Sequence, residues 1–460
     1  MPPAKVVIVG GGISGLSAAY YLSRAGIACT LIEKEARLGG VIRTDHIDGC
    51  VLERGPDSFL SVKTSALELI RELGLADQVI GSNDHLRRTF VLRHGRLVPL
   101  PDGLMMVVPT KLMPTAVSPL LGIGTKMRMA VEYFRRPSAT PPVDRSVAEF
   151  LRDHYGQETV DYLGEPLLAG VYGGDPGALS VNSVLPRFVE LERKYGSLTR
   201  GVLASRRAAA DAGGGPLFQT LKGGLSTLVD AMRAAMGDRV TVLRAEAEAV
   251  EQSPGGWRVR AGGEWMEGEQ IVIAARAWQS ADLLRDVDPT LAGLLGEVPY
   301  SSSMTLSLGY RRADIKHPLN GFGFLVPARE RRFLLACTWV GIKFPNRVPE
   351  NMSVLRCFMT GEALENSDEQ VVRLAREDLK RIMGMDAEPA FVNIARWPRA
   401  MAQYTVGHEN RLRRMREQIA TLPGLHFAGN AWSGIGIPDC IRTGREAAEA
   451  VRARAAVTAG

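Results

Sequence analysis

The sequence contains few cysteines, and their spacing excludes two classes of site. Its 460 residues include five, at positions 29, 50, 337, 357 and 440, and no two of them form a CxxC pair. Since an odd number cannot be fully paired, we expect neither a zinc site nor a disulfide framework, and reduced thiols as in a cytoplasmic protein. The seven histidines show no metal-ligand spacing either, so we predict no metal site.

Long hydrophobic runs are also missing. No stretch reaches the roughly eighteen uninterrupted apolar residues that a membrane-spanning helix needs. The apolar run that follows the N-terminus is too short for a secretory signal and enters a glycine turn at once. We therefore expect a cytoplasmic protein that touches a membrane, if at all, only peripherally at its inner face.

Charge of one sign is not concentrated anywhere in the chain. The 56 Lys and Arg residues are scattered among 50 Asp and Glu residues, which leaves a net charge of +6. This distribution indicates a solvated surface, and we expect no nucleic-acid partner. A weak attraction to anionic membranes or to polycarboxylate substrates stays open.

Glycine, by contrast, gathers near the N-terminus, where residues 5–15 read KVVIVGGGISG. The apolar run at 6–9 predicts a buried strand, residues 13–25 have the composition and spacing of a helix, and 28–32 predict a second strand. The pattern indicates a βαβ unit, with the glycines between its first strand and its helix.

Gly10, Gly12 and Gly15 form the GxGxxG fingerprint of a dinucleotide-binding turn in this position. The first glycine permits the tight turn, the second lets the backbone approach a pyrophosphate, and the third lets helix and strand pack closely. The phosphates would lie at the helix N-terminus, where unpaired N–H groups favour negative charge. Glu33 ends the second strand and is placed to accept hydrogen bonds from ribose hydroxyls, which disfavours NADP.

Further glycine-rich segments favour FAD over NAD. Glu33 begins an ExxxRxGG pattern, in which Arg37 and a second glycine turn can clamp phosphate oxygens, and the turn ERGPDSF at 53–59 could approach the flavin. Near the other end of the chain, HFAGNAWSGIGIPDCI places backbone N–H groups at a helix N-terminus, where a flavin edge is stabilised. Two helix ends that face one molecule need a long cofactor, and we predict non-covalent FAD. The predicted contacts are Gly10, Gly11, Gly12, Ile13, Ser14, Gly15, Glu33, Lys34, Arg37, Gly39, Gly40, Val41, Gly55, Pro56, Asp57, Ser58, Gly429, Gly434, Ile435, Gly436 and Ile437.

The remaining segments indicate two insertions into this cofactor-binding unit. Helical periodicity and a Pro-rich connector mark one of them, and strands around the helix EQVVRLAREDLKRIMG mark the other. The predicted fold class is α/β, with a discontinuous Rossmann-like FAD-binding domain, an α+β substrate domain and a helical insertion. The boundaries are 1–64, 217–297 and 395–460 for the FAD-binding domain, 65–104 and 298–394 for the substrate domain, and 105–216 for the helical domain.

Four local patterns give further expectations. Residues 43–52 alternate in polarity like one strand. The segment that begins FQTLKGG at 218 has the composition of a loop that opens into a helix, and SGIGIPD at 433–439 that of a turn before a helix. The glycine-rich stretch at 211–216 is typical of a flexible loop.

These segments, in this order, resemble the flavin-dependent amine oxidase and phytoene desaturase superfamily, and more closely the porphyrinogen oxidases of haem synthesis. GPDSFL, AGVYGGDP, ACTW and GIPDCI together are specific to the latter family, and the resemblance spans nearly the whole chain. GPDSFLSVK, ACTW and MMVVPTK are more similar to the Gram-positive coproporphyrinogen III oxidase branch than to the membrane-associated protoporphyrinogen oxidases. One departure is Ala402, which stands where the family commonly has proline before Gln-Tyr.

The resemblance implies an oxygen-dependent oxidase that converts coproporphyrinogen III to coproporphyrin III by repeated hydride transfer to the flavin, with release of hydrogen peroxide. No acid or base side chain is implied as a certain catalyst, because positioning against the flavin carries most of this chemistry. The implied partners are the porphyrinogen, molecular oxygen and the next enzyme of the haem pathway. The helical insertion is the implied site of peripheral membrane contact.

The resemblance also implies residues for the substrate pocket and for two flavin contacts. Lys63, beside Asp57, aligns with a lysine that faces the substrate, and Trp339 aligns with an aromatic ring stacked on the macrocycle. Trp397 resembles a tryptophan beside the flavin, and Val250 a residue whose backbone meets the adenine. The other pocket candidates, each with a solvated or core role as its alternative, are Arg87, Arg88, Phe322 and Leu325.

Three alternatives stay open on the sequence. Protoporphyrinogen IX oxidase differs only in a substrate with two fewer propionates. An amine oxidase or carotenoid desaturase shares the superfamily motifs, and amine oxidases that attach flavin covalently use a cysteine near the C-terminal glycine box, where Cys440 lies. A non-catalytic tetrapyrrole carrier could keep FAD as a structural ligand.

Overall fold

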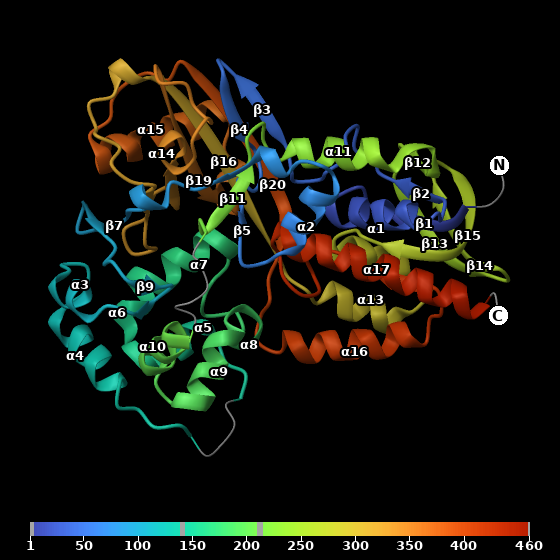
Figure 1. The fold of residues 1–460 in the computed structure, drawn as a ribbon, viewed down its shortest axis with the longest axis horizontal. Helices are drawn as coiled ribbons and strands as arrows, with labels where there is room; N and C mark the ends of the chain where they lie inside the picture. The colour runs from blue at the N-terminus through green and yellow to red at the C-terminus, as the bar shows by residue number, and fades with distance from the viewer. Residues whose placement is uncertain (1–3, 139–142, 209–214, 459–460) are drawn as a thin grey trace.

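The protein folds into three bodies, of which the first carries the glycine turn (Figure 1). The computed structural model describes residues 4–138, 143–208 and 215–458. In Figure 1 the first body lies on the right with both ends of the chain, a second sheet lies at the upper left, and the helical insertion lies at the lower left.

The first body contains a seven-stranded sheet. Its strands are β1 (Ala4–Val9), β2 (Cys29–Ile32), β12 (Val240–Leu243), β13 (Ala247–Ser253), β14 (Gly256–Ala261), β15 (Glu264–Ile273) and β21 (Leu425–Phe427). The order is β12-β2-β1-β15-β14-β13, with β21 beside β15. All pairs among β12, β2, β1, β15 and β21 are parallel, whereas β13, β14 and β15 form an antiparallel meander. Segments from the start, middle and end of the chain therefore share one sheet.

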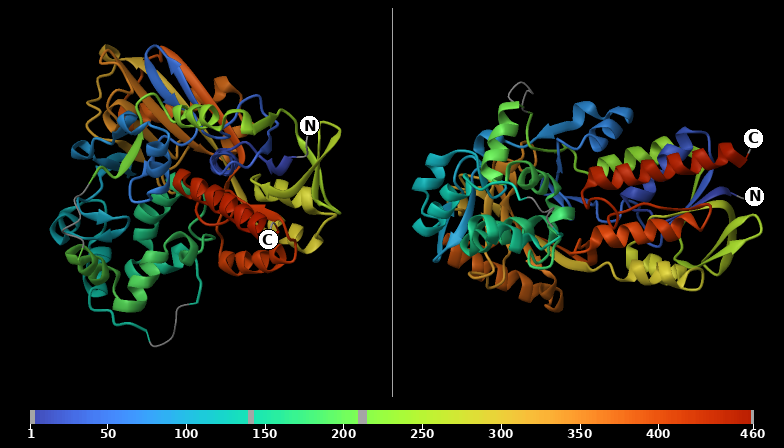
Figure 2. Two further views of the ribbon diagram at one scale, coloured as in Figure 1. Left: turned by 45° about the vertical axis from the view of Figure 1, so that its right-hand side comes forward. Right: turned by 90° about the horizontal axis from the view of Figure 1, so that it is seen from below.

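Helices cover both faces of this sheet (Figure 2). Because successive side chains of a strand point to opposite faces, Val6 and Ile8 of β1 pack in one core and Val7 and Val9 in the other. The first core includes α1 (Ile13–Arg24), α11 (Ser226–Met236) and α17 (Ile437–Thr458). The second includes α12 (Ala277–Leu284), α13 (Pro289–Gly296) and α16 (His408–Ala420). Because β1 is covered on both faces, all four residues of its apolar run at 6–9 are buried.

A second seven-stranded sheet forms the body at the upper left of Figure 1. Its strands, in spatial order, are β20 (Phe391–Ala402), β16 (Tyr300–Arg311), β19 (Met352–Thr360), β18 (Ala336–Trp339), β17 (Gly323–Leu325), β7 (Thr89–Arg93) and β8 (Arg96–Pro99). The amphipathic helix α15 (Asp368–Met383) packs its apolar face on this sheet. Ser367 begins that helix with a capping box to Gln370, as the Ser-x-x-Gln spacing favours.

Short elements make up the helical insertion and join it to the sheets. The insertion contains α3 (Leu112–Val117), α4 (Ile123–Glu132), α5 (Val147–Tyr155), α6 (Gln157–Thr159), the π-helix η3 (Val160–Gly164), α7 (Glu165–Tyr172), α8 (Val181–Val184), α9 (Pro186–Tyr195) and α10 (Leu198–Ala208). The joining elements are β3 (Thr44–Ile47), β4 (Cys50–Glu53), β5 (Phe59–Leu60), α2 (Ser65–Glu72), β6 (Val79–Gly81), β9 (Leu104–Met105), β10 (Val108–Pro109) and β11 (Phe218–Leu221). The strands of the two large sheets and the helices of the insertion come from the segments that the predicted boundaries give to each domain. We therefore propose the predicted division into three domains.

Three local expectations were wrong. The predicted strand at 43–52 is a hairpin of β3 and β4, since Asp48 and Gly49 both have positive φ and turn the chain. The segment that begins at Phe218 starts as a strand and not as a loop, because β11 pairs with β5 and β6, whereas the helix expected after it is present as α11. The C-terminal helix begins at Ile437, inside the predicted turn. The predicted flexible loop at 211–216 lies largely outside the described residues.

Within the described ranges, no helix combines the length and the apolar composition that a bilayer crossing requires.

Candidate functional site

One cavity of about 3100 Å³ lies between the three bodies and is lined by both ends of the chain. Ligand pockets usually measure roughly 300–1,000 Å³, so this volume has room for a long cofactor and a large substrate together. The predicted site residues that line it are Gly10, Gly12, Ile13, Ser14, Glu33, Lys34, Arg37, Gly39, Gly40, Val41, Gly55, Pro56, Asp57, Ser58, Lys63, Arg87, Phe322, Leu325, Trp397, Gly429, Gly434, Ile435, Gly436 and Ile437.

The glycine turn has the geometry that a dinucleotide needs. Gly10 has φ +106°, and a Cβ there would lie 2.8 Å from the carbonyl oxygen of Ala274 in the neighbouring loop. A Cβ on Gly15 would lie 1.9 Å from the carbonyl oxygen of Gly10, so helix and turn pack without space. A Cβ on Gly12 would meet no atom within 4 Å, and this residue borders the cavity in front of helix α1. Phosphate oxygens can therefore reach the N–H groups of this helix end.

Glu33 closes the turn from the end of β2. Its Oε2 accepts from the backbone N–H of Gly11 at 2.7 Å, and its Oε1 from that of Glu35 at 2.8 Å. A Cβ on Gly11 would lie 2.6 Å from Leu38, so Gly11 packs behind the turn and does not line the cavity, and neither does Gly15. The carboxylate is thereby fixed at the cavity wall, in the position suited to ribose hydroxyls.

Arg37 supports the second glycine turn. Its Nη1 donates to the carbonyl oxygen of Ile42 at 2.8 Å and its Nη2 to Ser226 Oγ at 3.4 Å. Partial burial lowers the pKa of the Arg37 guanidinium. The nearby carboxylates of Asp230 and Asp45 act in the opposite direction but do not cancel this effect. Arg37, Gly39 and Gly40 all line the cavity, so a charged side chain and two glycines meet at the place predicted for phosphate contact.

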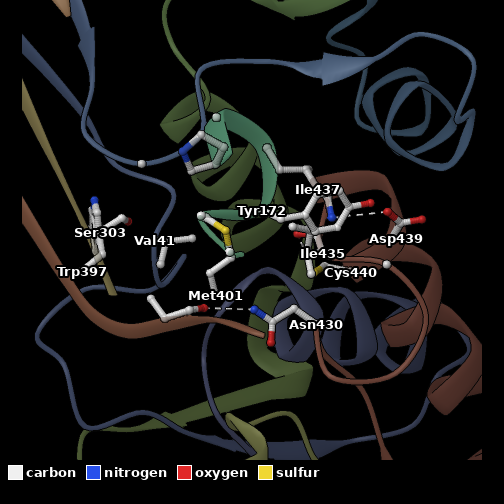
Figure 3. A pocket seen from close by; sticks show the side chains of 18 of the residues that line it. Val41, Tyr172, Ser303, Trp397, Met401, Asn430, Ile435, Ile437, Asp439 and Cys440 are labelled. Carbon is white, nitrogen blue, oxygen red and sulfur yellow. Dashed lines mark hydrogen bonds between the residues drawn. The ribbon is translucent and has the colours of Figure 1, made fainter. Parts of the chain in front are cut away.

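At the other end of the cavity, hydrogen bonds hold the C-terminal glycine loop, and Figure 3 shows Asn430 and Ile435 of this loop. Tyr404 Oη donates to the carbonyl oxygen of Asn430 at 2.7 Å and accepts from the N–H of Gly434 at 2.7 Å. The amide of Asn430 donates to the carbonyl oxygen of Ala400 at 3.0 Å and accepts from Tyr300 Oη at 3.1 Å. Helix α17 begins directly after this loop, so its free N–H groups lie at the cavity wall.

The turn at residues 53–58 is held by the second sheet. Trp397 Nε1 and Thr305 Oγ1 both donate to the carbonyl oxygen of Arg54, at 2.9 and 2.8 Å. The guanidinium of Arg356 donates to the carbonyl oxygen of Gly55. Trp397 also lines the cavity, so this predicted flavin contact braces the turn that carries the other predicted contacts.

Asp57 has two cationic partners that sequence reasoning missed. Lys343 Nζ lies 2.9 Å from Asp57 Oδ2, and Arg356 Nη1 lies 3.4 Å from it. Burial alone would raise the pKa of Asp57, but these two cations hold it well below its usual range. Lys343 follows the ACTW stretch, 286 positions from Asp57, and Arg356 lies farther along the chain in the middle of β19. Nothing in the local sequence marks either residue as a partner of the turn at 53–58.

Lys63 lines the cavity, but its charge is paired. Its Nζ lies 2.6 Å from Asp439 Oδ2, at the start of α17. Phe322 and Leu325 line the same cavity, as does Arg87.

Arg88, Trp339 and Val250 do not line the cavity. The carbonyl oxygen of Arg88 accepts from the N–H of Phe322, while its side chain is exposed. Trp339 is 1% exposed in the core of the second sheet, where its ring packs near Phe90 and His317. Val250 is buried in the first sheet, and residues 245–248 form the cavity wall beside it. None of these three residues therefore touches the cavity directly, as its predicted role in binding substrate or cofactor would require.

Cys440 does not favour covalent attachment of a cofactor. The residue is buried, and burial raises the pKa of its thiol to about 11. Since the thiolate is the reactive form, this side chain is a poor nucleophile, which is consistent with a non-covalently bound cofactor.

Comparison with known proteins decides the family. Residues 13–452 match the family described as flavin containing amine oxidoreductase. The chain belongs to this family. It is 33% identical to the coproporphyrinogen III oxidase of Bacillus subtilis (strain 168), with 96% of each chain covered, and 29% identical to that of Staphylococcus aureus, with 97% of this chain and 98% of the relative covered. The mitochondrial protoporphyrinogen oxidase of Nicotiana tabacum is 27% identical over 97% of this chain and 94% of its own.

Solved structures give the same result. A putative protoporphyrinogen oxidase from Exiguobacterium sp. 255-15 has a TM-score of 0.87 and 31% identity, with 98% of both chains covered. Putrescine oxidase, at a TM-score of 0.70 and 19% identity, shares the fold. The predicted fold class and the recognition of the family are confirmed, and the protein is an FAD-dependent oxidoreductase. The open space at Gly12 and the continuous cavity between the two helix ends fit this cofactor.

Proposed function

We propose that the protein oxidises coproporphyrinogen III to coproporphyrin III in haem synthesis, with molecular oxygen as the final acceptor and hydrogen peroxide as a product. The supporting observation is a cavity that joins the glycine turn to the C-terminal glycine loop and continues into the substrate sheet and the helical insertion. Relatives named coproporphyrinogen III oxidase match over nearly the full length of this chain.

The chain's own residues bind and position the reactants. Bound FAD supplies the hydride acceptor of this chemistry. Gly12 leaves room for the phosphates, Glu33 meets the ribose, and the loop at 429–437 faces the ring from the start of α17. Phe322 and Leu325 offer apolar walls to a flat macrocycle, a role that requires no titratable side chain.

Cations along the substrate end favour a substrate with many carboxylates. Arg87 and Lys111 line the cavity, and no ion pair to either is found among the described residues. Lys63 and Arg331 line it as well, each paired with one carboxylate. Four propionates can use more such cations than two, which ranks coproporphyrinogen above protoporphyrinogen as the substrate.

The test compares the two porphyrinogens under the same aerobic conditions. Porphyrin fluorescence should rise faster with coproporphyrinogen III than with protoporphyrinogen IX. The double variant Arg87→Gln, Lys111→Gln should reduce this difference in rate and leave the FAD content unchanged. Faster turnover of protoporphyrinogen IX would reverse the order of the two substrates. Anaerobic coproporphyrinogen that leaves the flavin colour unchanged would instead support a tetrapyrrole carrier.

The proposal includes a cytoplasmic location with peripheral membrane contact through the helical insertion, and with it a transfer of product to the next haem-pathway enzyme. Helix α4 and the residues after it expose Ile123, Met127, Val131 and Phe134, all at least 65% exposed. Ile123, Met127 and Val131 follow one another at intervals of four residues and so share one face of α4, and Phe134 comes just after the helix ends. Helix α4 lies at the lower-left edge of the molecule in Figure 1. Lys126, Arg128 and Arg136 flank this apolar face in the sequence, a composition typical of helices that lie at a membrane interface.

Vesicle sedimentation tests the membrane contact. The parent protein should sediment with anionic vesicles more than with zwitterionic ones, and Met127→Glu with Phe134→Glu should abolish this. Val392→Glu, a matched change at an exposed valine of the substrate sheet, should sediment like the parent. Equal sedimentation of all three proteins would exclude α4 as the contact.

A further inference from the structure

Asp439 is a cavity-wall carboxylate beside the loop that faces the flavin ring. A Cβ on Gly434 would lie 2.2 Å from its carboxyl carbon, and a Cβ on Gly436 would lie 3.2 Å from its Oδ2. The N–H of Gly436 donates to Oδ2 at 3.3 Å. The two glycines therefore make room for this carboxylate at the start of α17, where the side chain is 10% exposed and lines the cavity (Figure 3).

Lys63 connects Asp439 to solvent. Its Nζ lies 2.6 Å from Asp439 Oδ2, and its side chain remains 46% exposed although it also lines the cavity. The pair joins segments 376 positions apart in the sequence, one after β5 and one in α17. A proton that reaches the carboxylate thus has a hydrogen-bonded neighbour that is in contact with water.

Four other titratable groups along the cavity wall have shifted pKa values. Lys343 and Arg356 hold the pKa of Asp57 well below its usual range. Burial, with Asp439 nearby, raises the pKa of Tyr172 to about 12, so the phenol stays protonated. Burial raises the pKa of Cys440 to about 11 and lowers that of His408 to about 4. Asp439 lines the same wall, and its cationic partner Lys63 is partly exposed.

On the basis of the proposed function, we propose that Asp439, paired with Lys63, is the proton acceptor in oxidation of the porphyrinogen. In each two-electron step a C–H bond of a bridging carbon breaks, and its hydrogen leaves with both electrons as hydride to the oxidised flavin. The N–H bond of a neighbouring pyrrole breaks as well, its electron pair stays on nitrogen and forms the new double bond, and its proton passes to the Asp439 carboxylate. From there the proton leaves past Lys63 to water.

The first test is Asp439→Asn, which keeps an oxygen that can accept from Gly436 and removes the basic group. Coproporphyrinogen III is mixed anaerobically with the FAD-loaded protein, and the rate of flavin bleaching is followed over the pH range in which the protein stays folded. The rate should fall by about 100-fold, and its rise with pH should disappear. FAD content, the visible spectrum of the bound flavin and the affinity for coproporphyrin III should match those of the parent.

The second test changes the partner of Asp439 and keeps Asp439 itself. Lys63→Met removes the opposite charge that favours the ionised carboxylate, so the rise of bleaching rate with pH should move to higher pH. Lys63→Arg keeps the charge and should leave the profile in place. A purely structural role for the pair, such as capping α17, would lower stability and leave the profile unmoved.

The outcomes separate this inference from the proposed function. If neither porphyrinogen bleaches the parent protein, the proposed function fails and the inference with it. If the parent is bleached and Asp439→Asn reacts within about threefold of it with the same pH profile, the inference is overturned and the function stands. If Asp439→Asn loses FAD, Lys63→Met decides, because an unmoved profile overturns the inference.

Discussion

Gly12 and Gly15 stand three residues apart in one motif, and the structure gives them opposite surroundings. A methyl group on Gly12 would enter open space in the cavity, whereas on Gly15 it would overlap the carbonyl oxygen of Gly10. Gly12→Ala should leave the unfolding temperature of the cofactor-free protein unchanged and weaken FAD binding at least tenfold, because the methyl occupies the phosphate approach. Gly15→Ala should lower the free energy of unfolding by about 2 kcal/mol. Thermal unfolding and flavin titration of both apoproteins measure this, and equal stability losses would contradict it.

At this scale the sequence predicts what is local and misses what is distant. Gly10, Gly12 and Glu33 could be placed because the turn and its acid lie within one βαβ unit. The partners of Asp57 could not, since Lys343 and Arg356 approach it only when the second sheet packs on the turn. Aromatic residues give the weakest signal, because a tryptophan in the core and one beside a ligand have the same composition around them.

Asp57 itself gives a prediction with a defined pH dependence. Its folded pKa is depressed, so its contribution to stability is present above its unfolded pKa of about 3.9 and is lost as pH falls through the lower folded value. Asp57→Asn leaves Arg356 without its carboxylate partner and should cost roughly 3 kcal/mol at neutral pH. Urea unfolding should show the difference between parent and variant shrinking below about pH 4. A difference that stays constant down to about pH 2 would contradict the assignment.

At the scale of elements, hydrophobic periodicity predicts the helices and the buried strands well. It does not predict short strands, whose bounds depend on turns and on pairing partners. The helix predicted at 13–25 and the strand predicted at 28–32 appear as α1 and β2, within one residue of the predicted bounds. The hairpin of β3 and β4 was missed although its Asp48-Gly49 pair is a strong hairpin signal. Strand β11 is short and has no alternation of polar and apolar residues that marks it. Its partners β5 and β6 lie on the other side of the helical insertion in the sequence, so the pairing could not be foreseen.

The elements of the helical insertion are joined by one buried charge cluster. His154 of α5 places Nδ1 2.9 Å from Glu132 Oε1 and Nε2 3.1 Å from Glu192 Oε1. Glu132 also accepts from the N–H of Leu198 at 2.6 Å, so it caps α10. Each ring nitrogen of His154 therefore lies within hydrogen-bond distance of a carboxylate oxygen. Burial raises the pKa of Glu132, but hydrogen bonds from His154 and Thr199 bring it below its usual value.

Replacing the central histidine should destabilise this insertion. His154→Gln leaves Glu132 and Glu192 without the buried ring that contacts both, and should cost roughly 3 kcal/mol in the free energy of unfolding. His46→Gln, at an exposed histidine, should change it by less than about 0.5 kcal/mol. Because the folded pKa values of both carboxylates are depressed, the difference should be full above about pH 4.3 and shrink below it. Urea unfolding from neutral to acid pH measures both, and a loss that grows toward acid pH would contradict the cluster.

At the scale of the molecule, the first sheet explains how one cofactor meets both ends of the chain. β1 lies next to β15, and β15 lies next to β21, so the loops after β1 and β21 leave the same edge of the sheet. Those loops carry Gly10 to Gly15 and residues 429–437. Buried Arg347 adds a link between bodies, since it bonds Glu53 at 3.0 Å and Thr220 at 2.7 Å. The two insertions complete the cavity without interrupting this arrangement.

A cofactor that spans these two loops should protect both at once. Hydrogen exchange of the apoprotein and the FAD-loaded protein should show slower exchange at residues 10–16 and at 429–440 in the loaded form, because ligand binding to the folded state suppresses local opening. The helix at 123–132 borders no part of the predicted cofactor site and should exchange equally in both forms. At FAD about 100-fold above its dissociation constant, the loaded protein should gain about 2.7 kcal/mol of stability. Protection at the glycine turn with none at 429–440 would mean that the cofactor does not reach the C-terminal loop, and the assignment of the flavin ring to that loop would be wrong.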